Sequence, residues 1–269
     1  MLLCASTPMI PAETLTEKAE LLHGWGYDAI AVFQPYEHWN DSVYDELRTL
    51  ESRTGVRPVE FVLTSEIYGK AMSADATLRA ACRDMYRRAV DVCTELGMVT
   101  EVEYEYGQQD PMPLFDPYQQ MDAQQESEFI VFYRELLDRA RGSQASVLLE
   151  PLNRYESRYL NSVNDNLRIL RRVDHPNAGL LPDTFHMSIE EADLPEALRS
   201  AGDAVRHVHL GENNRTLPGH GTLDWAKIFD ALHDIGFDQT VNLECSTSGR
   251  PHETLPATAT LLREYMKVR

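Results

Sequence analysis

The sequence predicts one α/β domain, residues 1–269, folded as a (β/α)₈ barrel. Its 269 residues match the length that such barrels use as a single unit. Short β-rich apolar runs alternate with longer amphipathic stretches along the whole chain, the pattern of repeated βα units around a parallel sheet. Eight such units can be counted, and eight units indicate closure into a barrel.

The expected strands are the apolar runs that are too short for helices and rich in β-branched residues. In chain order they are Leu2–Ser6, Ala29–Phe33, Val59–Leu63, Val99–Tyr104, Val147–Glu150, Gly179–Pro182, Val205–His209 and Val241–Glu244.

The expected helices are the amphipathic stretches between these runs. Gly26, Gly97 and Gly236 each follow one and precede a strand, where a left-handed helix C-terminal glycine is expected. The helical stretches include Ala12–Gly24, Ser42–Arg53, Ala74–Leu96, Gln124–Arg141, Val163–Val173, Asp224–Ile235 and Glu253–Val268.

The charge balance argues against a nucleic-acid partner. Acidic residues number 43 against 25 basic ones, and the resulting net charge of −18 repels a phosphate backbone. Most of this acidity is interpreted as a solvated surface that aids solubility.

Cysteine usage and hydropathy indicate a cytoplasmic chain that does not enter a membrane. Cys4, Cys82, Cys93 and Cys245 form no CxxC pair, so we expect buried thiols rather than a thiolate metal site or a disulfide scaffold. The N-terminus lacks a basic region, and no run approaches 18 consecutive apolar residues.

One long segment, Gly107–Met121, interrupts the alternation. It carries three prolines together with Phe115 and Tyr118. Because loops of this length are uncommon in compact domains, we expect a lid or binding loop, with surface decoration as the alternative.

Polar residues end four successive strands in the second half of the chain. The active site of a (β/α)₈ barrel lies at the C-terminal ends of its strands, so these side chains should meet at one mouth. Three carboxylates and one imidazole suit Mn²⁺, Mg²⁺, Co²⁺ or Zn²⁺. Taken singly, each has a structural alternative, such as a cap or a satisfied barrel histidine like His207. The four candidate ligands are Glu150, Asp183, His209 and Glu244.

Further polar residues follow these four at short offsets, in loops where a substrate's hydroxyl groups could be bound. The alternative for Glu156 and Arg215 is that they solvate loop tips. The residues are Asn153, Glu156, His186, Glu212, Asn213, Asn214 and Arg215.

These motifs carry a resemblance. The strings EPLNRYE, LPDTFHMSIEE, HVHLGENNRTLPGHGTLDW and NLEC resemble the xylose-isomerase-like barrel superfamily, most of all its ketose 3-epimerases, which act on sugars such as D-tagatose and D-psicose. The resemblance extends from about Ser146 to Thr247. In the N-terminal half, AVFQPYEHW and TEVEYEYGQQDPMPLF depart from it, which leaves the sugar open.

The resemblance implies that Glu150, Asp183, His209 and Glu244 bind a divalent metal, with Mn²⁺ expected first and Co²⁺ next. It also implies a homodimer or tetramer. The substrate would be held near its carbonyl end by Glu156, His186 and Arg215.

The expected reaction is epimerisation or isomerisation of a keto sugar through an enediolate. Glu150 and Glu244 would exchange protons with opposite faces of the carbon next to the carbonyl, as an acid/base pair. No glycine-rich phosphate loop stands out, which favours an unphosphorylated carbohydrate.

Three alternatives remain open at this point. A C-glycoside deglycosidase would use the same base to eliminate the aglycone of a 3-keto glycoside, and such enzymes pair with a small second subunit. An AP-endonuclease-like repair enzyme would need additional metal ligands on the early strands and a basic face. A non-catalytic sugar-binding module is disfavoured by the presence of both acid/base carboxylates.

Overall fold

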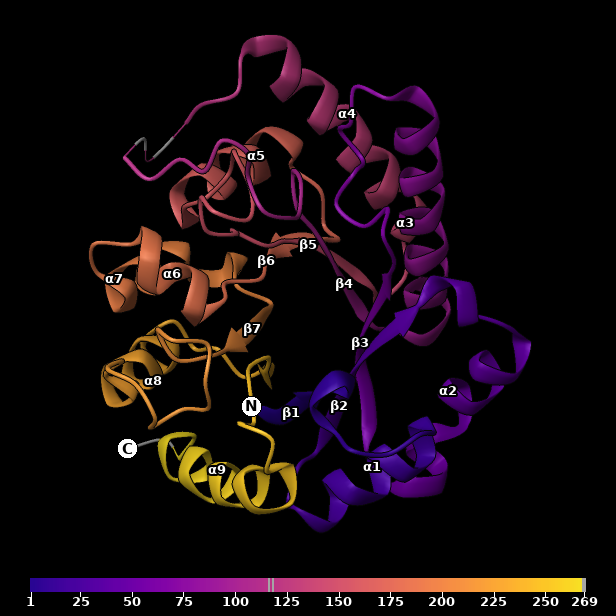
Figure 1. Cartoon of the computed structure of the whole chain (residues 1–269), viewed down its shortest axis with the longest axis vertical. Coiled ribbons are helices and arrows are strands. Elements are labelled where there is room, and N and C mark those ends of the chain that lie inside the picture. The colour runs from indigo at the N-terminus through magenta and orange to yellow at the C-terminus, as the bar shows by residue number, and fades with distance from the viewer. Residues whose placement is uncertain (116, 118, 268–269) are drawn as a thin grey trace.

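The computed structural model describes residues 1–115, 117 and 119–267, and these residues form the expected barrel of parallel strands inside a ring of helices (Figure 1). The hydrogen-bonded strand order is β6-β5-β4-β3-β2-β1-β8-β7. Parallel bridges from Leu180 to Val205 and from Asp183 to His209 join β6 to β7. The predicted (β/α)₈ fold is therefore confirmed.

The strands begin and end close to the predicted positions. Their ends decide which polar residues face the mouth, because the first residues after a strand form the upper rim. The strands are β1 (Leu2–Ser6), β2 (Ala29–Pro35), β3 (Arg57–Thr64), β4 (Val99–Val102), β5 (Ser146–Leu149), β6 (Ala178–Leu180), β7 (His207–Leu210) and β8 (Thr240–Leu243).

The helices cover the outside of the barrel, and three short 3-10 turns lie between elements. The helices are α1 (Leu15–Gly24), α2 (Asp41–Thr54), α3 (Ala76–Leu96), α4 (Ala123–Ala140), α5 (Val163–Val173), α6 (Thr184–Glu190), α7 (Leu194–Ala201), α8 (Trp225–Asp234) and α9 (Pro251–Tyr265). The 3-10 turns are η1 (Thr7–Met9), η2 (Tyr36–His38) and η3 (Gly202–Ala204). The last predicted helix extended to Val268, which lies outside the described residues.

Helices α6 and α7 occupy a stretch for which the sequence analysis named no helix range. Each begins at an aspartate that accepts a hydrogen bond from the first turn: Asp183 from the Phe185 amide at 2.6 Å, and Asp193 from the Glu196 amide at 3.0 Å. Such caps satisfy amides that have no partner within the helix. At seven and eight residues, both helices are too short to show a clear apolar period.

The predicted glycine positions after the helices are confirmed. Gly97 caps α3 with φ of 72°, and Gly26 and Gly236 adopt φ of 87° and 68° just after α1 and α8. In this left-handed region a side chain is strained, which explains glycine at these turns.

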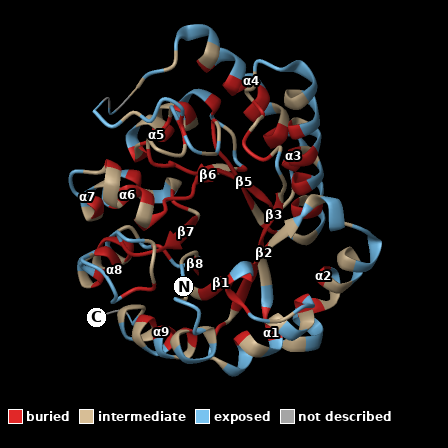
Figure 2. Cartoon of the chain, in the orientation of Figure 1, coloured by how far each residue is buried: buried red, intermediate tan, exposed pale blue. Residues whose placement is uncertain are grey.

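The apolar core lies between the barrel wall and the helices, where buried residues line both surfaces (Figure 2). All four cysteines are free thiols, and Cys245 is only partly buried, unlike the other three, which corrects the prediction for that residue. Among the described residues, no helix is long and apolar enough to cross a membrane.

The long loop between β4 and α4 is attached to the loop after β5. The amides of Gly107 and Gln109 donate to the carbonyls of Glu156 and Tyr155 at 2.9 and 3.0 Å. Phe115 is 92% exposed, and Tyr118 lies outside the described residues. The attachment places this loop beside the predicted substrate-binding residue Glu156, and its role as a lid stays a prediction.

Candidate metal and substrate site

The four predicted ligands meet at one point of the barrel mouth. Glu150 and Glu244 are the residues directly after β5 and β8, Asp183 caps α6 after β6, and His209 lies within β7. One potential ligand atom from each lies within 4.8 Å of the others. Metal bonds of about 2.0–2.4 Å permit such separations, so a single ion fits between them.

The hydrogen-bonding state of these side chains supports a cation site. Glu150 Oε1, Asp183 Oδ2 and His209 Nδ1 are buried and have no hydrogen-bond partner among the described residues. His209 Nδ1 lies 2.9 Å from Glu244 Oε2 and 3.6 Å from Glu150 Oε1, but without hydrogen-bond alignment. Buried polar atoms normally have partners, so unpaired atoms that face one another fit a bound ion.

Burial without a cation disfavours the charged forms of these carboxylates. Burial, followed by repulsion from Glu244, raises the pKa of Asp183 to about 7. Burial also raises the pKa of Glu150 well above its usual range, against the opposing effect of His209. A divalent ion would favour the ionised forms and reverse both shifts.

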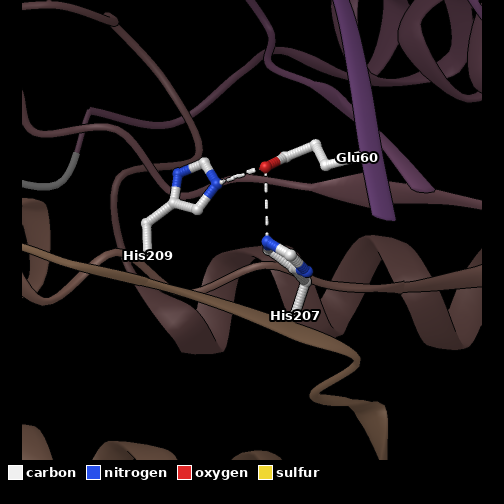
Figure 3. A group of neighbouring side chains, drawn as sticks. All are labelled: Glu60, His207 and His209. Atoms are coloured by element: carbon white, nitrogen blue, oxygen red, sulfur yellow. Dashed lines mark hydrogen bonds and ion pairs between the residues drawn. The ribbon is translucent and has the colours of Figure 1, made fainter. Parts of the chain in front are cut away.

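His209 is oriented from behind by a buried carboxylate on β3. Glu60 is fully buried, and its two oxygens lie 3.2 and 3.1 Å from His209 Nε2 (Figure 3). The bond to Nε2 leaves Nδ1 directed at the other three ligands. An imidazole that binds a metal commonly has its second nitrogen fixed by a carboxylate in this way.

The same carboxylate contacts two further polar side chains. His207 Nε2 lies 3.3 Å from Glu60 Oε2, and the Asn242 amide donates to that oxygen at 3.3 Å. Burial alone would raise the pKa of Glu60, but the neighbouring His209 and His207 outweigh it and lower the pKa. The sequence analysis interpreted His207 as a satisfied barrel histidine, but its Nε2 has no aligned hydrogen bond among the described residues and only lies close to Glu60.

Sequence reasoning missed Glu60 and Asn242. Both lie inside strands instead of at strand ends, so neither marks the end of an apolar run. The available signal was a charged residue within the apolar strand RPVEFVLT, which implies a buried partner.

The three predicted substrate-binding residues line the rim above the ligands. Arg215 Nη1 lies 3.3 Å from Glu156 Oε1, and Arg215 Nη2 lies 3.5 Å from Glu244 Oε1. The guanidinium also lies 4.7 Å above the ring of Phe185. Arg215 has a φ of 56°, a strained conformation for a residue other than glycine.

His186 presents a hydrogen-bond donor to the site. Its Nδ1 accepts from the Asn153 amide at 3.1 Å, which assigns the proton to Nε2. Burial lowers the pKa of His186 well below its usual range, and Arg215 adds to this effect. The neutral ring therefore leaves a buried Nε2–H with no partner among the described residues.

Two of the predicted polar residues in the loop after β7 form hydrogen bonds within the loop itself. Glu212 accepts hydrogen bonds from the Gly219 amide, the Leu223 amide and Trp225 Nε1 at 2.8, 3.1 and 2.7 Å. Its carboxylate thus holds the loop together and does not face the substrate, which corrects the expectation for Glu212. Asn213 likewise accepts from the Thr222 amide, within the loop.

Two cavities open at the mouth and share Phe33, Arg215 and Glu244. One, of about 220 Å³, is lined by Phe33, Thr64, Ser65, Tyr68, Glu101, Glu103, Tyr106, Glu150, Leu152, His186, Arg215 and Glu244. The other, of about 350 Å³, is lined by Ser6, Pro8, Met9, Phe33, Asn214, Arg215, Glu244, Cys245 and Ser246.

Sequence relatives of this chain include sugar epimerases. Over 111 residues it is 40% identical to the D-psicose 3-epimerase of Ruminiclostridium cellulolyticum. The matched segment covers 41% of this chain and 38% of that protein. Over 86 residues it is 41% identical to the 3-dehydro-D-guloside 4-epimerase of Escherichia coli, covering 32% and 33%. The matched segments thus span less than two fifths of these relatives.

Structural similarity extends over the whole barrel. A D-allulose 3-epimerase from Methylomonas sp. superimposes with a TM-score of 0.82 at 21% identity, covering 99% of this chain and 98% of that one. At this identity the match shows a shared fold. The family model described as xylose isomerase-like TIM barrel matches residues 19–265. The chain therefore belongs to the xylose isomerase-like TIM barrel family.

Proposed function

We propose that the protein is a divalent-metal-dependent keto-sugar epimerase in which Glu150 and Glu244 form the acid/base pair. The observation that carries the proposal is the convergence of these two carboxylates with Asp183 and His209 on one point, at which all but Glu244 are buried. The names of the relatives, which epimerise ketoses or a keto glycoside, support the substrate class.

Glu150, Asp183, His209 and Glu244 would hold the metal, Mn²⁺ first, with Co²⁺, Mg²⁺ or Zn²⁺ as alternatives. When bound, such an ion supplies Lewis-acid stabilisation of negative charge on the substrate's oxygens.

The two glutamates follow strands five and eight of the barrel, so they approach the substrate from different sides. One removes a proton next to the carbonyl to give an enediolate, and the other returns a proton to the opposite face, which inverts the carbon.

The rim residues would bind the carbonyl end of the sugar. The His186 Nε2–H donates to a substrate oxygen, while the Arg215 guanidinium offers its fork of donors to oxygens above Glu244. Glu156, which contacts Arg215, accepts from a hydroxyl. The substrate would be a carbohydrate, and the protein would assemble as a homodimer or tetramer.

The test is turnover in D₂O by the Mn²⁺-loaded protein, with D-fructose, D-psicose, D-tagatose and L-ribulose as substrates. Deuterium is expected at the inverted carbon, because the returned proton comes from a carboxyl that exchanges with solvent. The Glu244→Gln variant is expected to lose turnover while it retains part of its metal. Continued epimerisation by that variant would exclude Glu244 as acid or base.

A second candidate substrate is a 3-keto glycoside, and the adjoining cavity of about 350 Å³ favours it. A free hexose needs one cavity, whereas a glycoside has a second group to accommodate. The name of the Escherichia coli relative, 3-dehydro-D-guloside 4-epimerase, describes a 3-keto glycoside as its substrate.

With such a substrate the same base could epimerise the sugar or eliminate its aglycone. Release of the aglycone from a 3-keto C-glycoside, without deuterium incorporation into any ketose, would favour the deglycosidase. Co-purification of a small second subunit would support that outcome. Deuterium incorporation without aglycone release would favour the epimerase.

A further inference from the structure

Two buried carboxyl groups of β4 lie beside the four ligands and have no part in the mechanism above. Glu101 is within β4 and Glu103 follows its end, so both side chains point to the same face, the barrel interior. They are 4% and 2% exposed. One oxygen of each, together with one of Glu150, lies within 4.8 Å of the other two.

Tyrosine hydroxyls hold three of the four oxygens of this pair. Tyr68 Oη lies 2.8 Å from Glu101 Oε1 and 2.5 Å from Glu103 Oε1, and Tyr86 Oη donates to Glu103 Oε2 at 2.9 Å. The fourth oxygen, Glu101 Oε2, is buried and has no hydrogen-bond partner among the described residues. The Glu101 side chain is one of those that line the cavity of about 220 Å³, so a ligand in this cavity would lie beside it.

The charge of this cluster is not balanced by its own contacts. Burial raises the pKa of Glu101 well above its usual range, with Glu150 and Glu103 adding repulsion, and burial raises that of Glu103 to about 7. Tyrosine hydroxyls donate hydrogen bonds but bring no positive charge. Three carboxyls this close in a buried site require a cation or additional protons.

We propose that Glu101, Glu103 and Glu150 form a second divalent-cation site, with the Glu150 carboxylate bridging the two ions. The inference rests on the proposed role of Glu150 as a ligand of the first ion. Oxygen bonds of about 2.0–2.4 Å permit the observed separations, and bridged pairs of ions in enzymes lie about 3.5–4 Å apart.

The all-oxygen ligand set selects hard cations such as Mn²⁺ or Mg²⁺ over Zn²⁺. Tyr68 and Tyr86 fix the orientation of the two β4 carboxylates, as hydrogen-bonding groups behind metal ligands do. Glu101, Glu103 and Glu150 all line the cavity of about 220 Å³, so substrate or water in that cavity could complete the ion's coordination.

Tyr68 has one proton for the two carboxylate oxygens that its hydroxyl contacts, so the pair has more acceptor oxygens than donors. A cation would supply the positive charge that the tyrosines lack.

The experiment is titration of the full-length metal-free protein with Mn²⁺ by calorimetry and low-temperature electron paramagnetic resonance. Two ions per chain are expected, with the signal of a spin-coupled pair. Glu101→Gln should bind one ion and lose the coupled signal. The matched control is Glu105→Gln, since Glu105 accepts a hydrogen bond from the Arg158 amide outside the cluster and should leave both ions in place.

The outcomes separate this inference from the proposed function when Asp183→Asn is titrated in parallel. If the unsubstituted protein binds one ion that Asp183→Asn abolishes and Glu101→Gln retains, the second site is refuted and the first stands. One ion lost in Glu101→Gln but kept in Asp183→Asn would refute the four-ligand site. Binding of no ion refutes both sites. If Glu101→Gln does not fold, Glu103→Gln replaces it with the same expectation.

Discussion

At the scale of single residues, the site divides side chains that hold the ion from side chains that hold the substrate. Arg215 shows the division most directly, because it contacts Glu156 and Glu244 through its guanidinium and lines both cavities. Its contact with the ligand set is a long one, 3.5 Å to Glu244 Oε1.

Arg215→Ala should lower kcat/KM by about tenfold to a thousandfold, because a charged hydrogen bond to substrate contributes about 1.5–3 kcal/mol and more when it forms in the transition state. Metal content, measured by elemental analysis, should not change. Arg250→Ala is the control, since Arg250 is an exposed residue after β8 that pairs with Glu253. Loss of metal from Arg215→Ala would contradict the division of roles.

Glu60 illustrates a residue that acts through another. Glu60→Gln keeps the size of the side chain but weakens its hold on His209 Nε2, so the affinity for Mn²⁺ should fall about 10- to 100-fold. Calorimetric titration of the metal measures this without any assay of turnover. Glu60→Asp is expected to recover part of the affinity. An unchanged dissociation constant in Glu60→Gln would show that Glu60 is only structural.

At the scale of elements, the loop between β7 and α8 depends on one buried carboxylate. Glu212 is fully buried and pairs two backbone amides and the Trp225 indole, so the loop that positions Arg215 is built around it. Gly221 is required beside it, because a Cβ there would lie 2.4 Å from Glu212 Oε2.

Glu212→Ala should therefore reduce the free energy of unfolding by about 3 kcal/mol, since it leaves three donors without a partner. Urea denaturation followed by circular dichroism measures the change. Glu212→Gln, which keeps an acceptor, should lose less. If Glu212→Ala is as stable as the unsubstituted protein, the carboxylate does not organise the loop.

At the scale of the whole molecule, metal binding and stability are linked through pH. Asp183, with a pKa near 7, holds a proton in the folded metal-free protein at pH values where the unfolded chain, with a pKa of about 3.9, has released it. Its contribution to the stability of the metal-free protein therefore declines as the pH rises from about 4 to 7. A metal must displace this proton to bind.

The increase in melting temperature caused by saturating Mn²⁺ should accordingly be larger at pH 8 than at pH 5.5. Scanning fluorimetry with and without the metal at both pH values measures it. In Asp183→Asn, which has no proton to displace there, the dependence on pH should diminish. An Mn²⁺ effect that is equal at both pH values would show that the buried carboxylates are not its ligands.

The sequence by itself determined the barrel and placed the four candidate ligands. Both follow from local patterns: the alternation of apolar runs gives the strands, and a polar residue at the end of a run gives the mouth. Glu150, Asp183, His209 and Glu244 could be found because each ends a run or nearly does so, and all four converge in the structure.

Only the tertiary structure decided which residues surround those ligands. Glu60 and Glu101 lie inside strands, where a charge appears as a break in the apolar pattern. Their partners, His209 and Glu150, come from strands 149 and 49 positions later in the chain. These pairs form only when the barrel closes, and the periodicity of the sequence does not predict them. Because the energy of a buried carboxylate depends on its neighbours in space, its role emerges only when the strands have been brought together.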